Sequence, residues 1–199
     1  MVRRILVTVG INIAALFVAS VFIDGISKAF AATGLRVGFA LGPLDVIGRM
    51  SSLLGHVGAW APRPEQTGTR ALLEDPGAMR AFRARFHDGV EARLTALRRG
   101  LQSLKDRGLA VESIAPQGAI YLTARFHPFG RRTRDGSVLR TNEDVRRHLL
   151  EAAGVAAVPF QAFGATADDG WFRLSVGAVG EDEILAALPR LAEALESLS

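Results

Sequence analysis

The sequence contains no cysteine, so disulfide frameworks and cysteine zinc sites are excluded. The histidines show no metal-binding spacing, and we predict no metal site; they are His56, His87, His127 and His148. Aromatic residues make up only 7% of the chain, and no ribbon of alternating aromatic and basic residues indicates single-strand stacking. Lysine is also scarce, because only Lys28 and Lys105 occur in the whole chain.

Charge of one sign is not concentrated anywhere in the chain. The formal net charge is +4, and the arginines alternate with Asp and Glu instead of forming one block. We therefore predict no nucleic-acid partner and keep nucleic-acid binding, based on the arginine excess, as a weaker alternative. With 49% apolar and 22% charged residues among 199, the composition is that of a globular protein with one large or two small domains.

The longest uncharged run is Ile5 to Ile23, preceded by two arginines and followed by Asp24. Its length suits a membrane-spanning or signal-like helix. Its many Val, Ile and Thr residues equally suit a buried strand. Both interpretations stay open, so a membrane tether through residues 5–23 is one alternative.

After this run, hydrophobic periodicity predicts alternating strands and helices, with most of the strands in the carboxyl half. Helices are expected at residues 43–55, 65–73, 76–107, 142–153 (capped by Asn142) and in a final segment that contains Pro189. Strands are expected at residues 36–41, 111–115, 119–126, 155–159 and 171–176. The fold class is α/β, with a weak domain boundary inside the long helix.

The residues most suggestive of chemistry lie between Asp24 and Gly38. Lys28 follows a predicted strand, in a loop of small residues that would let a ligand approach the backbone. Arg36 follows with a planar guanidinium suited to a phosphate. A lysine for a carbonyl group and an arginine for a phosphate together fit pyridoxal phosphate. The alternative is an ordinary surface lysine in a glycine-rich turn.

The segment from Ser27 to Gly38 resembles the cofactor-lysine motif of class I/II aminotransferases, which are fold-type I pyridoxal-phosphate enzymes similar to aspartate aminotransferase. The similarity covers about residues 22–198. Three further segments follow in the family's order: Pro116 to Tyr121, Val155 to Gly164 with its Phe-Gly pair, and Phe172 to Ser175.

This resemblance implies a role for each matching residue. Lys28 would form a Schiff base with the cofactor and move the substrate α-proton, while Arg36 and Ser27 would hold the cofactor phosphate. Arg173 would bind the substrate α-carboxylate. The implied activity is amino-group transfer from an amino acid to a 2-oxo acid, in a cytoplasmic enzyme whose longer relatives are homodimers.

The resemblance also implies a domain arrangement, namely part of a large-domain sheet followed by a small α/β domain. We expect residues 1–21 to be an apolar segment unlike the family and residues 22–75 to be a remnant of the cofactor-binding domain. Residues 76–199 would form the linking helix and the small domain.

Departures from the family pattern limit the expected activity. Gly25 stands where many members have a serine, and the segment from Gly58 to Pro62 lacks an Asn-Pro pair. The family's aspartate for the pyridine nitrogen has no counterpart in residues 1–21, so we expect a fragment with little or no activity alone. The alternative is a non-catalytic remnant or a membrane-tethered interaction protein.

Overall fold

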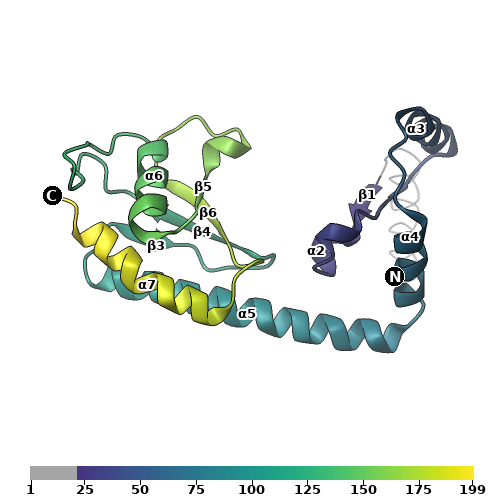
Figure 1. Cartoon of the computed structure of the whole chain (residues 1–199), viewed down its shortest axis with the longest axis horizontal. Helices are drawn as coiled ribbons and strands as arrows, with labels where there is room; N and C mark the ends of the chain where they lie inside the picture. The colour runs from purple at the N-terminus through teal and green to yellow at the C-terminus, as the bar shows by residue number, and fades with distance from the viewer. Residues whose placement is uncertain (1–21) are drawn as a thin grey trace, which may run out of the picture. The chain divides into compact units, whose positions relative to one another are not determined.

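Residues 22–199 are described in a computed structural model, in which the chain divides into two units between Ala84 and Arg85 (Figure 1). The apolar run from Ile5 therefore lies outside the described residues, except for its last two positions. Within residues 22–199, no helix is both long and apolar enough to cross a bilayer.

The first unit is built on a two-stranded antiparallel sheet. Strand β1 (Phe22–Gly25) pairs with β2 (Gly38–Leu41), and the register places Phe22 opposite Leu41 and Gly25 opposite Gly38. A connection of residues 26–37 joins the two strands and contains the short helices α2 (Ile26–Ala29) and η1 (Thr33–Leu35). Helices α3 (Leu44–Val57) and α4 (Arg63–Leu73) follow, close to the expected segments.

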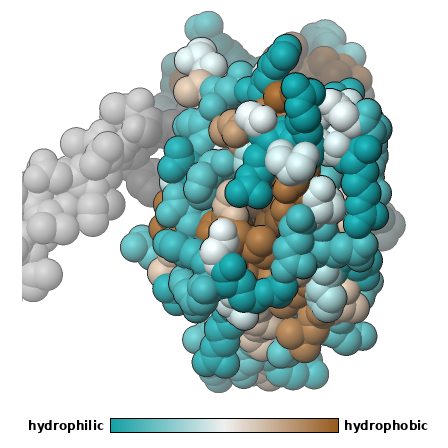
Figure 2. Space-filling model, turned by 90° about the vertical axis from the view of Figure 1, so that its left-hand side faces the viewer, coloured by the Kyte–Doolittle hydropathy of each residue, from teal (hydrophilic) through white to brown (hydrophobic). Residues whose placement is uncertain are grey.

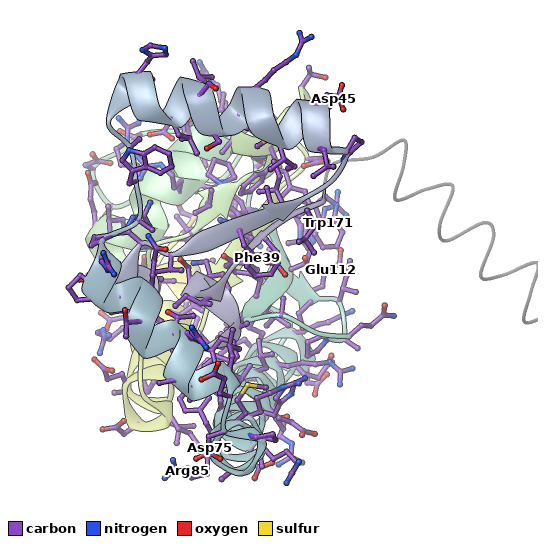
Figure 3. All side chains as sticks on the ribbon, turned by 90° about the vertical axis from the view of Figure 1, so that its right-hand side faces the viewer. Phe39, Asp45, Asp75, Arg85, Glu112 and Trp171 are labelled. Carbon is purple, nitrogen blue, oxygen red and sulfur yellow. The ribbon has the colours of Figure 1, made fainter. Side chains whose placement is uncertain are left out.

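The first unit buries little of its apolar surface. Ile26 is its one buried hydrophobic residue among those described, and α3 buries none of its side chains. Phe39 on β2, labelled in Figure 3, is half exposed. The other large exposed apolar residues of this unit are Ile23, Leu35, Leu41, Leu44, Leu53, Leu54, Val57, Trp60 and Leu73.

The second unit contains a four-stranded antiparallel sheet in the order β3-β4-β6-β5. Its strands are β3 (Val111–Ser113), β4 (Tyr121–Phe126), β5 (Val158–Pro159) and β6 (Trp171–Ser175). Its helices are the second part of α5 (Pro76–Asp106), α6 (Asn142–Ala153), the short η2 (Phe160–Phe163) and α7 (Glu181–Glu196). Strand β5 is shorter than the expected 155–159, and the short helix η2 was not predicted. The other elements of this unit lie close to their expected positions.

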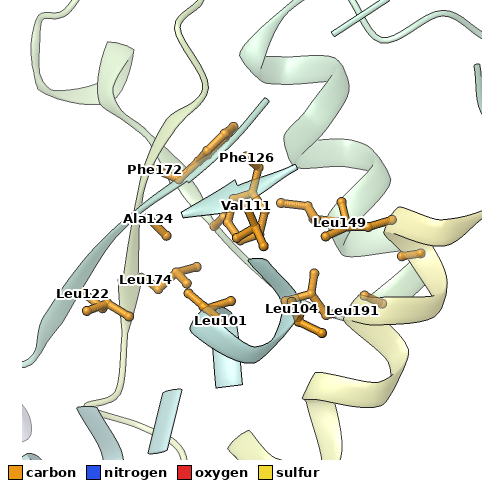
Figure 4. Packing of buried hydrophobic residues seen from close by; sticks show 14 of the residues in the cluster. Leu101, Leu104, Val111, Leu122, Ala124, Phe126, Leu149, Phe172, Leu174 and Leu191 are labelled. Atoms are coloured by element: carbon orange, nitrogen blue, oxygen red, sulfur yellow. The ribbon is translucent and has the colours of Figure 1, made fainter. Parts of the chain in front are cut away.

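One hydrophobic core holds the second unit together. Alternate residues of β4 and β6 point inward, so that Leu122, Ala124 and Phe126 are fully buried beside Phe172. The helices supply the other side of this core with Leu101, Leu104, Leu149 and Leu191 (Figure 4). The face of this unit shown in Figure 2 is mostly hydrophilic, with hydrophobic residues visible mainly as a strip down its middle.

The N-terminus of α6 corrects one expectation. The cap is Thr141, whose hydroxyl accepts from the Asp144 amide while the Asp144 carboxylate accepts from the Thr141 amide. This reciprocal arrangement satisfies two backbone donors at once. Asn142 is therefore the first helical residue rather than the cap, and its side chain is buried and used elsewhere.

Candidate cofactor and substrate site

Lys28 lies on the connection between β1 and β2, in the single turn of helix α2. The amide of Phe30 donates to the Ile26 carbonyl at 3.1 Å, and the amide of Ala32 donates to the Ser27 carbonyl at 2.9 Å. The buried Ile26 side chain and a stacked contact between Phe30 and Phe82, with ring centroids 5.9 Å apart, anchor this turn. The backbone around Lys28 is thus held in place while the lysine itself stays exposed.

Two glycines allow the ends of this connection to approach closely. Gly25 and Gly38 are paired across β1 and β2. A Cβ atom on Gly25 would lie 3.2 Å from the Val37 carbonyl oxygen, and one on Gly38 would lie 3.1 Å from the Asp24 carbonyl oxygen. Because both neighbours are backbone atoms, a side chain at either position would require the facing backbone to shift by a few tenths of an ångström.

Arg36 lies at the other end of the same connection. Its backbone is in the left-handed region, with φ 54°. Its guanidinium donates one long hydrogen bond, 3.4 Å from Nη1 to the Thr33 carbonyl oxygen, and forms no ion pair with any residue in the range 22–199. Most of its donors are therefore available to an anion.

Ser27, Lys28 and Arg36 all belong to the connection of residues 26–37, whose ends are paired at Gly25 and Gly38. In the described part of the chain, neither the Ser27 hydroxyl nor the Lys28 amine has a side-chain partner. A free primary amine, a hydroxyl and a largely free guanidinium, carried by a connection of mostly small residues, fit the aldehyde and the phosphate of pyridoxal phosphate. The donor set present therefore suits this cofactor.

Arg173 belongs to the second unit and lies on β6, opposite Thr123 of β4 and Val158 of β5. Its Cζ atom lies 4.2 Å from the ring centroid of Tyr121 and 4.2 Å from that of Phe163. No carboxylate among residues 22–199 pairs with it. A half-buried guanidinium held by rings and lacking an anionic partner is suited to bind a carboxylate.

The loop that carries Phe163 is tied to the start of α6 by a buried amide. The Asn142 side chain donates to Gln161 Oε1 at 2.9 Å and accepts from the Gly170 amide at 2.8 Å. Gln161 in turn donates to the Ala167 carbonyl at 2.7 Å. One side chain thus holds both η2 and the residue that enters β6.

A hollow of about 580 Å³ in the second unit lies away from Arg173. It is lined by α6, α7 and residues 133–139, and neither Tyr121 nor Phe163 contributes to its wall. In the part of the chain that the structure describes, no cluster of three His, Asp or Glu residues could hold a metal ion. The hollow is therefore separate from the carboxylate site proposed at Arg173.

Sequence reasoning gave Tyr121 and Phe163 no role of their own and treated Asn142 only as a helix cap. Tyr121 and Phe163 lie in two segments that carry the family resemblance, and the structure places both of their rings against Arg173. The available signal was that each segment contains an aromatic residue. Asn142 gave no such signal, because capping explained it equally well.

Known proteins support the resemblance along almost the whole chain. A family model described as aminotransferase class I and II matches residues 4–193. This range includes most of residues 1–21, which we expected to be unlike the family. An aspartate aminotransferase of Rhizobium meliloti is 31% identical over 89% of this chain, and a probable aspartate/prephenate aminotransferase of Thermus aquaticus is 32% identical. The chain spans 41% of the length of each of these two relatives.

Solved structures give the same result for the fold. The aspartate aminotransferase structure from Rhizobium meliloti superposes with a TM-score of 0.77 and 29% identity, covering 92% of this chain and 44% of that one. The Thermus thermophilus enzyme with maleate gives a TM-score of 0.73 and 31% identity over 88% of this chain and 41% of that one. The chain belongs to the class I and II aminotransferase family and has part of the fold-type I α/β architecture, with a partial large-domain sheet followed by a small α/β domain.

Proposed function

We propose that this chain carries part of the site of a pyridoxal-phosphate-dependent aminotransferase, which moves an amino group from an amino acid to a 2-oxo acid. Family membership supports the reaction class. The main structural support is the placement of Lys28 and Arg36 on one connection, closed at its base by the Gly25–Gly38 pair. We propose a cytoplasmic location on the resemblance alone.

Each proposed residue has a separate task. Lys28 would hold the cofactor through its amine, and Lys28 Nζ would take the proton from the substrate α-carbon. Arg36 would hold the phosphate through its free N–H groups, and the Ser27 hydroxyl would donate to the same phosphate. When bound, the cofactor supplies an electron-accepting ring that stabilises negative charge on the substrate α-carbon.

Arg173 would bind the substrate α-carboxylate. Its planar guanidinium can donate two parallel hydrogen bonds to a carboxylate, an arrangement that also fixes the orientation of the substrate. Aspartate is the first amino donor to test, because similar proteins are named as aspartate aminotransferases.

A single-turnover assay tests this proposal. The chain is mixed with pyridoxal phosphate and L-aspartate, and pyridoxamine phosphate and oxaloacetate are quantified. We expect the two products in equal amounts, above the background of Lys28→Ala. Losing two charged hydrogen bonds should raise the aspartate concentration needed for half-maximal rate by about tenfold or more in Arg173→Ala.

The outcomes are distinct. Product from Lys28→Ala equal to that from the parent would contradict the role of Lys28. An unchanged aspartate dependence in Arg173→Ala would contradict carboxylate binding by Arg173. The expectation that this chain alone has little or no aminotransferase activity stays a prediction, and ordinary multiple turnover would overturn it.

A further inference from the structure

Arg173 differs from a neighbouring arginine in how its donors are used. Arg125 on β4 also lies over a ring, with Cζ 5.8 Å from the Trp171 centroid. Its donors are used within the protein, since Nε donates to the Asp169 carbonyl at 2.7 Å and Nη1 to Glu112 at 3.3 Å. Arg173 has closer ring contacts, and no residue of the described chain accepts a hydrogen bond from it. Rings can hold a guanidinium without using its hydrogen-bond donors.

We propose that Tyr121 and Phe163 are positioning residues, which hold the Arg173 guanidinium in the orientation that binds a substrate carboxylate. This inference rests on the proposed function of Arg173. An arginine held by a carboxylate would have to give up that ion pair before binding substrate. Rings attract the cation through its face and leave the in-plane N–H groups free.

The placement of Phe163 is itself supported. Phe163 is 53% exposed, so burial alone does not explain its position. It packs edge-on against Phe160, with centroids 6.2 Å apart, and its short helix is held through Gln161 by the buried Asn142. Tyr121 is held by β4, where it pairs with Ser175 of β6. The two rings are therefore fixed by two separate elements, β4 and η2, which both precede Arg173 in the sequence.

Nuclear magnetic resonance of the 199-residue chain tests this inference directly. The Nε–Hε and Cδ–Hδ signals of Arg173, assigned with Arg173→Lys, report ring contact through ring-current shifts. We expect these signals to lie upfield in the parent. They should move toward the position of a free arginine in Phe163→Leu and in Tyr121→Leu, and they should stay near the parent position in the ring-preserving Phe163→Tyr and Tyr121→Phe.

Titration with maleate, a rigid dicarboxylate, then measures the consequence for binding. We expect maleate to shift the Arg173 signals of the parent. The dissociation constant should rise about two- to fivefold in each leucine variant, as expected for loss of one cation–π contact, and should be restored in the ring-preserving variants. Arg125→Lys serves as a matched control that should leave the affinity unchanged.

Two different results would show whether the positioning role alone is wrong or whether the carboxylate site at Arg173 is wrong as well. If maleate shifts Arg173 but the leucine variants bind it as tightly as the parent, the positioning role is wrong and the carboxylate site stands. If maleate leaves the Arg173 signals of the parent unchanged, both are wrong. Backbone amide spectra of β4 and α6 identify any leucine variant that has not folded. If one has not, the Arg173 shifts and the maleate affinity of the ring-preserving variants, which should match the parent, test the positioning role instead.

Discussion

Gly170 occupies a position where a side chain would meet the backbone of a neighbouring strand. Its φ is 81°, its amide donates to Asn142, and its carbonyl accepts from the Phe126 amide. A Cβ atom there would lie 2.3 Å from the Phe126 carbonyl oxygen. Since Gly170 leads directly into β6, this close approach helps to place Arg173.

Gly170→Ala should therefore destabilise the second unit by about 3 kcal/mol, through left-handed strain combined with the steric clash. Gly130 is a matched control, because its φ is 83° and a Cβ atom there would meet nothing within 4 Å. Gly130→Ala should cost only about 1 kcal/mol, from backbone strain alone. Urea unfolding measures both free energies, and equal losses would contradict the role given to the clash.

Helix α6 begins with an acidic cap that makes its stability depend on pH. The Arg140 amide and the Thr141 hydroxyl both donate to the Asp144 carboxylate, and these bonds hold the pKa of Asp144 below its usual value. A lowered pKa in the folded state means that this contribution is fully present above the ordinary aspartate value. It is lost as the pH falls through the folded-state pKa.

Asp144→Asn should reduce the free energy of unfolding by about 1 kcal/mol at pH 7, the usual size of a capping interaction. Urea unfolding of the parent and the variant at pH 7 and at pH 3 measures the difference. The gap should shrink at the lower pH, because pH 3 lies below the ordinary pKa of aspartate and the unfolded carboxylate is then protonated. A gap that stays constant between the two pH values would show that the carboxylate charge contributes nothing.

The element boundaries show what local pattern can and cannot predict. The long helix was predictable because its apolar residues recur every three or four positions, and it ends at Asp106 close to the expected stop. The cap of α6 was placed one residue late, because Thr and Asn are both good caps and the capping box decides between them. Strand β5 is short because pairing with β6 stops at Val158 and Pro159, a tertiary property without a local signal.

The candidate site was predictable only in part. Residue chemistry singled out Lys28 and Arg36, and family similarity added Ser27 and Arg173; the roles of all four stay predictions. The aromatic contacts of Arg173 join β4 to η2 and β6, and β4 is far from the other two in the sequence. Such contacts depend on the sheet order, which hydrophobic periodicity does not reveal.

The buried core is distributed unequally over the whole molecule. The hydrophobic cluster of the described residues lies entirely within residues 90–198, whereas residues 22–84 contain a single buried apolar residue, Ile26. Burial of apolar surface is the main stabilising contribution in folding. The stability of the described chain therefore comes mainly from the second unit.

A fragment of residues 85–199 should fold without the first unit. We expect its amide spectrum to overlay that of the same residues in the full chain, with one cooperative urea transition. Phe126→Ala in this fragment should lower the free energy of unfolding by about 3–5 kcal/mol, as for other large buried residues. A fragment without dispersed amide signals would contradict the assignment of the core to this unit.

Covalent trapping tests the central claim most directly, because the chain contains only two lysines. Lys105 serves as the internal control, since it is half exposed and its Nζ lies 3.8 Å from Glu112. The chain is incubated with pyridoxal phosphate and reduced with borohydride, and the modified peptides are quantified by mass spectrometry. We predict a phosphopyridoxyl group on Lys28 in large excess over Lys105, and a smaller excess in Arg36→Gln. Equal labelling of the two lysines, or labelling of Lys105 alone, would contradict the account.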